Sequence, residues 1–108
     1  MAWSSQLRGK EIAINIYATQ GLRVEHGIDW AEEYILGLVA ATADLSTTAA
    51  MVVAREAMSP NTAFKHITNL VQKGYLEQGS IPDNRYKPLS LSKKGEDYLN
   101  KLRYFYAS

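Results

Sequence analysis

The stretch that decides the fold, "SPNTAFKHITNLVQKGYL", runs from Ser59 to Leu76 and carries signals for both ends of a helix. Ser59 is a good N-cap because its hydroxyl can accept a hydrogen bond from a free backbone amide, and Pro60 suits the first helical position. Gly74 suits the left-handed conformation that often follows a helix C-terminus. The sequence therefore predicts a helix that begins at Pro60 and ends just before Gly74.

This predicted helix has two unlike faces. At about 100° per residue, its apolar side chains share roughly a third of the circle and should pack into a core. They are Ala63, Ile67, Leu70 and Val71, with Phe64 at the edge. The opposite face is polar and consists of Asn61, Thr62, Lys65, Thr68, Asn69 and Gln72. No acidic residue occurs between Asn61 and Lys73.

The residue types on the polar face can read DNA. Amide side chains can bond an adenine edge at two places, lysine can donate to guanine or phosphate, and threonine offers a hydroxyl and a methyl group. The simpler alternative is a solvated face with no partner. The order of elements favours DNA, because a short helix, a tight turn, this helix and a basic hairpin form a helix-turn-helix with a wing.

The neighbouring segments supply those other elements. "TTAAMVVAREA", begun by Ser46 or Thr47, predicts the short preceding helix. The later stretch "YLEQGSIPDNRYKPLSLS" has the form of a β-hairpin with a long tip. Pro88 restricts the second arm to a sheet edge or a bulge, which suits a small wing. Ser92 then caps a last helix.

Two more helices are expected before the helix-turn-helix. Residues 4–19 have an apolar helical face, although Ile12, Ile14 and Ile16 also fit the alternation of a strand. We favour the helix because no partner strand lies close by in the sequence. Residues 21–29 are bounded by glycines near each end and predict a loop.

The second of these helices follows that loop. Asp29 and Glu32 have the spacing of a capping box that opens a helix, which should run to about Ala43. Its apolar residues cover nearly the whole circumference, so we expect a central helix buried on most sides. They are Trp30, Tyr34, Ile35, Leu36, Leu38, Val39 and Ala41.

Composition bounds the classes of protein that this chain can belong to. Its 108 residues are 46% hydrophobic, which suits one domain with its own core. The absence of cysteine excludes disulfides, thiolate zinc sites and a catalytic thiol. No segment has the length and polarity of a signal peptide or membrane span, so we expect a cytoplasmic protein without membrane contact.

Charge is distributed unevenly along the chain, although the net charge is only +1. Residues 1–54 carry three Lys/Arg and six Asp/Glu, whereas residues 55–108 carry nine and five. The basic half therefore contains the predicted helix that begins at Pro60 and the predicted hairpin.

Catalysis is not expected. The two histidines, His26 and His66, lie in different elements, and no nucleophile triad, phosphate loop or metal-ligand cluster accompanies them. We therefore predict that the protein is not an enzyme and needs no cofactor or metal.

The stretch "MSPNTAFKHITNLVQKGYLEQ", followed by "PDNRYKPLSLSKKGEDYL", resembles the winged helix-turn-helix of MarR-type regulators. The resemblance covers about Asp29 to Leu102. The matching positions are Asp83, Asn84 and Arg85 at the family's wing tip, and Leu91, Ser92 and Gly95 at the start of its next helix.

The resemblance implies a set of DNA-binding residues. The positions that meet the major groove are Ser59, Asn61, Thr62, Phe64, Lys65 and Asn69. Arg85 would approach the minor groove, with Asp83 as its buttress. Together with the charge pattern, this predicts phosphate contacts from Lys65, Lys73, Arg85, Lys87, Lys93 and Lys94.

These observations predict a mostly helical α+β fold, a winged helix-turn-helix with flanking N- and C-terminal helices. We expect a single domain, with a core over residues 29–92 and with residues 1–28 and 93–108 forming a homodimer interface. The aromatic C-terminal helix and Trp3 and Leu7 are candidates for that interface.

The function that follows is sequence-specific binding of double-stranded DNA by a dimeric transcriptional repressor. Two alternatives remain open: a DNA-binding protein of plasmid or phage partition or replication, and a winged-helix protein-interaction module. We expect no dedicated pocket for a small-molecule effector.

Overall fold

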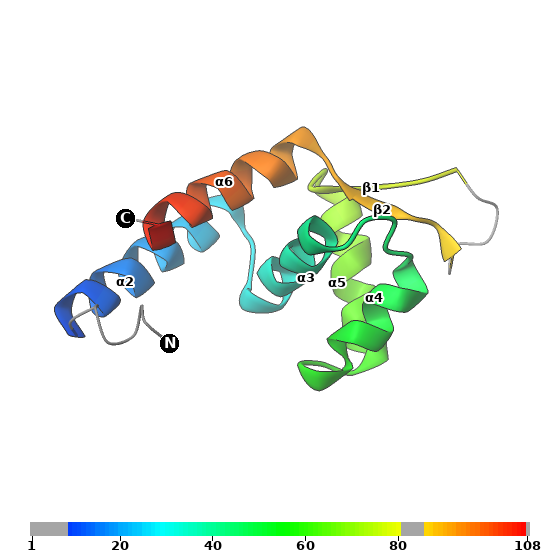
Figure 1. Cartoon of the computed structure of the whole chain (residues 1–108), viewed down its shortest axis with the longest axis horizontal. Coiled ribbons are helices and arrows are strands. Elements are labelled where there is room, and N and C mark those ends of the chain that lie inside the picture. Colours follow the sequence, from blue (N-terminus) through cyan, green and yellow to red (C-terminus); the bar gives the residue numbers. More distant parts are fainter. Residues whose placement is uncertain (1–8, 81–85, 108) are drawn as a thin grey trace.

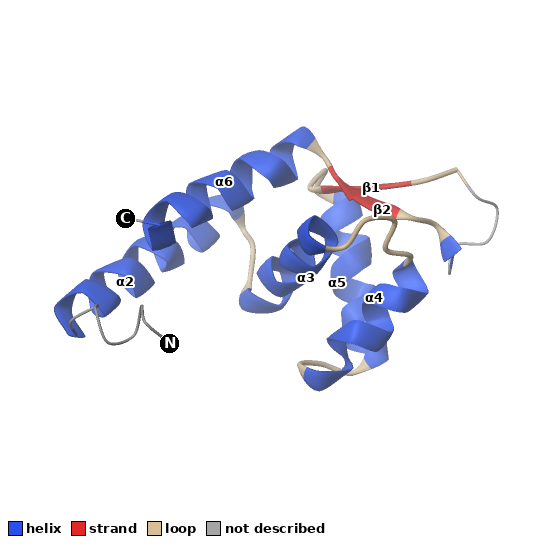
Figure 2. Cartoon of the chain, viewed as in Figure 1, coloured by secondary structure: helices blue, strands red, loops and turns tan. Residues whose placement is uncertain are grey.

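The computed structural model describes the backbone of residues 9–80 and 86–107, and side chains from residue 18 to 80 and from 86 to 104. The elements in chain order are α2 (Gly9–His26), α3 (Trp30–Ala41), α4 (Thr47–Val53), the 3-10 turn η1 (Ala54–Glu56), α5 (Pro60–Gln72), β1 (Leu76–Gln78), β2 (Leu89–Leu91) and α6 (Lys93–Ala107). This confirms the predicted mostly helical fold with a small hairpin and flanking helices (Figure 2).

The molecule has an arm and a body (Figure 1). The arm consists of α2 and α6, which pack side by side and project from the body of α3, α4, α5 and the hairpin. The principal dimensions are 49 × 25 × 22 Å, and the arm and the body occupy opposite halves of the long axis. No helix in the described ranges is long and apolar enough to cross a membrane.

Helix α5 begins and ends as the sequence predicts. The Ser59 hydroxyl accepts a hydrogen bond from the Thr62 amide at 3.2 Å, and Pro60 is the first helical residue. Beyond the C-terminus, Gly74 has a φ of 86°. Since this is the left-handed region that L side chains rarely adopt, a glycine is needed at this position.

The apolar face of α5 is the part that enters the core. Ala63, Ile67 and Leu70 are fully buried, and Val71 is partly buried against them. Phe64 is 44% exposed, so it lies at the surface beside the core. The predicted division of the helix into two faces is therefore confirmed.

Helix α3 begins at the predicted capping box. The Glu32 amide donates to Asp29 Oδ1 at 2.8 Å, and the Asp29 amide donates to Glu32 Oε1 at 3.3 Å. The expectation of burial on most sides was wrong. Trp30 is 62% exposed and Tyr34 is 39% exposed, because the other helices cover only the face that carries the buried residues Ile35, Leu36 and Val39.

The predicted loop at residues 21–29 was also wrong. Helix α2 continues to His26, and only a short turn from Gly27 to Asp29 separates it from α3. The extra turns are retained because Leu22 and Arg23 are buried, at 6% and 4% exposure. The helical interpretation of the first segment is confirmed from Gly9 onward, whereas Trp3 and Leu7 lie outside the described residues.

The hairpin has the predicted antiparallel form. Leu76 faces Leu91 and Gln78 faces Leu89 in its register. Pro88 lies just before β2, where it makes an isolated bridge with Ser46. This edge position accommodates a residue that has no amide hydrogen to donate. The predicted wing-tip residues Asp83, Asn84 and Arg85 lie outside the described residues.

Candidate nucleic-acid interface

The outer face of α5 is exposed and polar. Asn61, Thr62, Lys65, Thr68 and Gln72 are exposed, and Asn69 is half-buried. This surface, which we call the reading face, carries amide, hydroxyl and ammonium groups and no carboxylate. It can donate to and accept from the edge of another molecule at several positions along the helix.

The start of the reading face is held by the helix cap. The Ser59 hydroxyl accepts from the Thr62 amide and also lies 2.9 Å from the Thr62 hydroxyl, to which it donates. Both side chains are therefore oriented before any partner arrives. Immediately upstream, Met58 N donates to Ala54 O at 2.9 Å, which closes the tight turn between α4 and α5.

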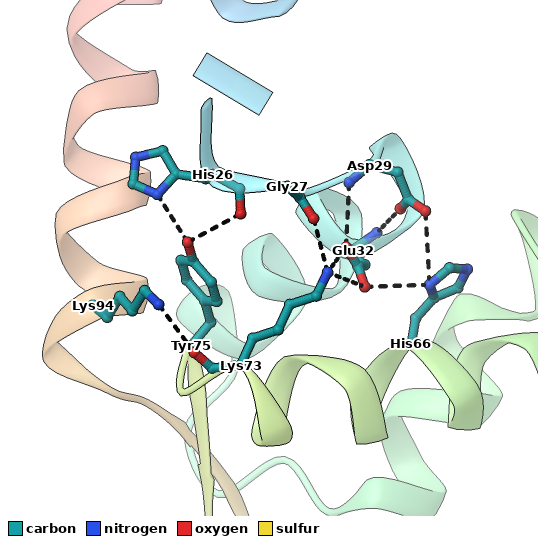
Figure 3. Close-up of polar contacts among 8 residues, drawn as sticks. All are labelled: His26, Gly27, Asp29, Glu32, His66, Lys73, Tyr75 and Lys94. Carbon is teal, nitrogen blue, oxygen red and sulfur yellow. Dashed lines mark hydrogen bonds and ion pairs between the residues drawn. The ribbon is translucent and has the colours of Figure 1, made fainter. Parts of the chain in front are cut away.

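Lys73 has partners within the protein (Figure 3). Its ammonium donates to Gly27 O at 2.8 Å and to both oxygens of Glu32, at 3.0 and 3.2 Å. The Glu32 side chain is only 3% exposed, whereas that of Lys73 is 38% exposed. The predicted phosphate contact of Lys73 would thus compete with an ion pair that ties the end of α5 to the start of α3.

The other predicted cations have different surroundings. Lys94 donates to Lys73 O at 3.1 Å and lies 4.6 Å from the centre of the Tyr75 ring. It therefore sits at the negative end of α5, which offsets its unfavourable place in the first turn of α6. Lys93 is highly exposed and 3.8 Å from Asp97.

The wing residues that were predicted to bind DNA are only partly described. Lys87 is half-buried, and its carbonyl accepts from the Thr47 amide at 3.1 Å. The hairpin is thereby attached to the first turn of α4. Arg85 lies outside the described residues, so its predicted minor-groove contact stays a prediction.

A cluster of buried polar groups joins the arm to the body, and sequence reasoning missed it. Arg23 makes two hydrogen bonds to Glu33, at 3.0 and 3.2 Å, and its guanidinium carbon lies 3.3 Å from the centre of the exposed Trp30 ring. The Tyr98 hydroxyl donates to Glu33 Oε2 at 2.6 Å. Helices α2, α3 and α6 are thus linked through one carboxylate.

A second set of contacts continues this link to the end of α5. The Tyr75 hydroxyl lies 2.8 Å from His26 Nδ1, and the rings of His26, Tyr75 and Tyr98 meet edge to face. Burial raises the pKa of the Tyr98 phenol, and the hydrogen bond to Glu33 and that carboxylate's charge raise it further. Burial, followed by the charge of Glu32, also raises the pKa of Tyr75.

The structure brings some predicted site residues together and keeps others apart. Lys65, Asn69 and Lys73 line one surface groove, which also includes the side chain of His66. The other side of the groove is lined by three groups of residues: Gln20, Arg23 and Val24 of α2, Gly27, Ile28 and Asp29 of the turn after it, and Trp30 and Glu32 at the start of α3. Lys87, Lys93 and Lys94 do not line this groove.

A different, largely apolar groove lies between α3, α6 and the turn before α5. It is lined by Trp30, Tyr34, Met58, Leu99 and Leu102 among others. The expected absence of an effector pocket therefore stays a prediction.

Solved structures show which proteins share this fold. Staphylococcus aureus MarR in complex with salicylate and kanamycin has a TM-score of 0.69 and 22% sequence identity, over 82% of this chain and 58% of its own. The S. aureus MepR–DNA complex has a TM-score of 0.74 and 15% identity, over 91% of this chain and 81% of its own. A MarR transcriptional regulator from Methanosarcina mazei has a TM-score of 0.67 and 17% identity, over 92% of this chain and 73% of its own.

These likenesses establish the fold. The chain has the winged-helix fold of the MarR-type regulators, as its motifs predicted, although it spans little more than half the length of the S. aureus MarR chain. No protein-family model and no curated protein matches the sequence.

Proposed function

We propose that this chain, which has the fold of the MarR-type regulators, binds double-stranded DNA as a dimeric transcriptional repressor. The observation that carries the proposal is the reading face of α5, which is exposed, polar and free of carboxylates. In a helix-turn-helix the second helix lies in the major groove, and α5 is that helix. One of the solved structures with this fold is a complex with DNA.

Base discrimination would come from the first half of the reading face. Asn61, Thr62, Lys65 and Asn69 combine donors, acceptors and a methyl group that distinguish base pairs in the major groove. Lys65 also supplies positive charge for phosphate attraction, which contributes most of the affinity of such proteins. Ser59 and Phe64 border this set, at the cap and at the edge of the core.

The proposed dimer would form through the arm. Helices α2 and α6 project from the body, so two copies joined by their arms would present two α5 helices on separate bodies. A two-fold axis between them would match an inverted repeat in the DNA. Occupation of such a site in a promoter would exclude the transcription machinery, which is the physical basis of the proposed repression.

Selection of duplexes from a random DNA pool tests this proposal, with wild type and Lys65→Ala compared. We expect wild type to enrich an inverted repeat with half-sites about one helical turn apart, and the variant to lose that enrichment. Lys101→Ala is the matched control, because it removes the same charge from an exposed position on α6, and size-exclusion chromatography verifies that all three proteins have the same oligomeric state. No enrichment, with weak and equal retention of all three proteins, would contradict DNA reading and favour a protein-interaction module.

A further inference from the structure

His66 lies on α5 beside the reading face and points at two carboxylates of α3 (Figure 3). Its Nδ1 is 3.7 Å from Glu32 Oε2 and 3.9 Å from Asp29 Oδ2, and its side chain is 15% exposed. These separations suit an ion pair but are too long for good hydrogen bonds. The Nδ1 atom of His66 is buried and has no hydrogen-bond partner among the described residues.

The facing carboxylates favour a proton on Nδ1, because a lone pair there would point at negative oxygens. A second proton on the ring makes it a cation that both carboxylates attract. Histidine is the side chain whose charge ordinarily changes between about pH 5 and 8. Protonation of His66 would therefore turn its contacts with Glu32 and Asp29 into ion pairs.

The charges around this groove balance while His66 is neutral. From α3, Asp29 and Glu32 contribute two negative charges, and Lys73 of α5 contributes one positive charge to Glu32. Arg23 of α2 lines the same groove, but Glu33 neutralises it. Lys65 of α5, the remaining charged lining residue, supplies the second positive charge.

With a neutral His66 the groove therefore has no net charge to attract DNA phosphates at the flank of α5, and a protonated His66 adds one positive charge there. We propose that His66 is a proton-sensitive positioning residue: its protonation adds this positive charge and completes the attachment of α5 to the start of α3, so that DNA binding tightens on mild acidification. This inference rests on the proposed DNA binding. It concerns one side chain that does not itself belong to the reading face.

The chain is favourable for testing this idea, since it has two histidines and no cysteine. The affinity for a labelled random-sequence duplex pool can be measured by fluorescence anisotropy at constant salt, near pH 6 and near pH 8. We expect wild type to bind about threefold more tightly at the lower pH, the size of one partly screened charge interaction. His66→Gln should lose the difference, whereas His26→Gln, which removes the other histidine, should retain it.

Asp29→Asn provides a second, independent variant that preserves the fold. Asparagine keeps the side-chain oxygen that caps α3 but removes one of the two charges facing His66. We expect Asp29→Asn to bind more tightly than wild type near pH 8 and to respond less to pH. Circular dichroism at each pH verifies that the variants are folded.

The outcomes separate this inference from the proposed function. A wild-type affinity that is equal at the two pH values, or a pH response that persists in His66→Gln, would overturn the role of His66 and leave DNA binding in place. An absence of binding by every variant at both pH values would overturn the proposed function, and this inference with it.

Discussion

Lys73, one residue beyond the last turn of α5, donates to the buried carboxylate of Glu32, which also closes the capping box of α3. The Glu32 side chain therefore stabilises the start of α3 and, through Lys73, holds the end of α5. Lys73 Nζ also reaches Gly27 O, so the turn between α2 and α3 belongs to the same junction. The end of α5 is thus attached to the turn between α2 and α3.

The first prediction concerns the charge of Lys73 in DNA binding. Because its ammonium is engaged by Glu32, we expect Lys73→Gln to leave the salt dependence of DNA affinity nearly unchanged. Lys65→Ala, which removes an exposed ammonium, should reduce the slope of log affinity against log salt by about one. Titrations at several salt concentrations check this. Equal reductions in the two variants would place Lys73 among the phosphate contacts.

The second prediction concerns the stability that this ion pair supplies. We expect a double-mutant cycle of Glu32→Gln and Lys73→Met to give a coupling free energy of about 1–2 kcal/mol, because one partner is buried and the other is partly solvated. Urea unfolding of the four proteins measures it. Lys93→Met with Asp97→Asn is the exposed comparison pair, expected to couple by about 0.3 kcal/mol. If the coupling free energy of Glu32 and Lys73 were no larger than that of the exposed pair, the structural role of the Glu32–Lys73 ion pair would be refuted.

The third prediction concerns alkaline pH. The pKa of Tyr98 in the folded state is raised above its ordinary value of 10.0, so folding retains a proton that the unfolded chain releases. The resulting stability is complete below about pH 10 and is lost as the pH rises toward the raised pKa. Tyr98→Phe should therefore show a weaker loss of stability above about pH 10, although it lacks the bond to Glu33 at neutral pH.

Urea unfolding between about pH 8 and 11 measures this effect, with Tyr34→Phe as the control at an exposed position. An identical alkaline decline in Tyr98→Phe and wild type would show that the buried phenol does not contribute to it.

The fourth prediction concerns two glycines in helices. A Cβ at Gly95 would collide with the backbone oxygen of Tyr75, so we expect Gly95→Ala to destabilise the fold by about 1–3 kcal/mol. A Cβ at Gly37 would meet nothing within 4 Å, so Gly37→Ala should stabilise it by about 0.5–1 kcal/mol. Thermal melts of the two variants compare them directly. A Gly95→Ala melting temperature at or above that of wild type would contradict the close approach of α6 to Tyr75, and a lower melting temperature of Gly37→Ala would contradict the open space at Gly37.

The local signals in the sequence were sufficient for much of the fold. Ser59, Pro60 and Gly74 bounded α5, and Asp29 with Glu32 marked the start of α3, because caps act through bonds between residues that are near in the chain. The hairpin was also predicted correctly, from its turn residues and Pro88. The two faces of α5, and thus most of the candidate interface, followed from helical periodicity alone.

The tertiary structure decided where those elements meet and which charges remain available. The extension of α2 to His26 depends on burial of Leu22 and Arg23 against the body, and the exposure of Trp30 depends on which faces the other helices cover. The pairing of Lys73 with Glu32 joins residues 41 apart. Composition and periodicity specify which side chains a helix can offer, but a distant contact is set by the packing of whole elements, which local patterns do not encode.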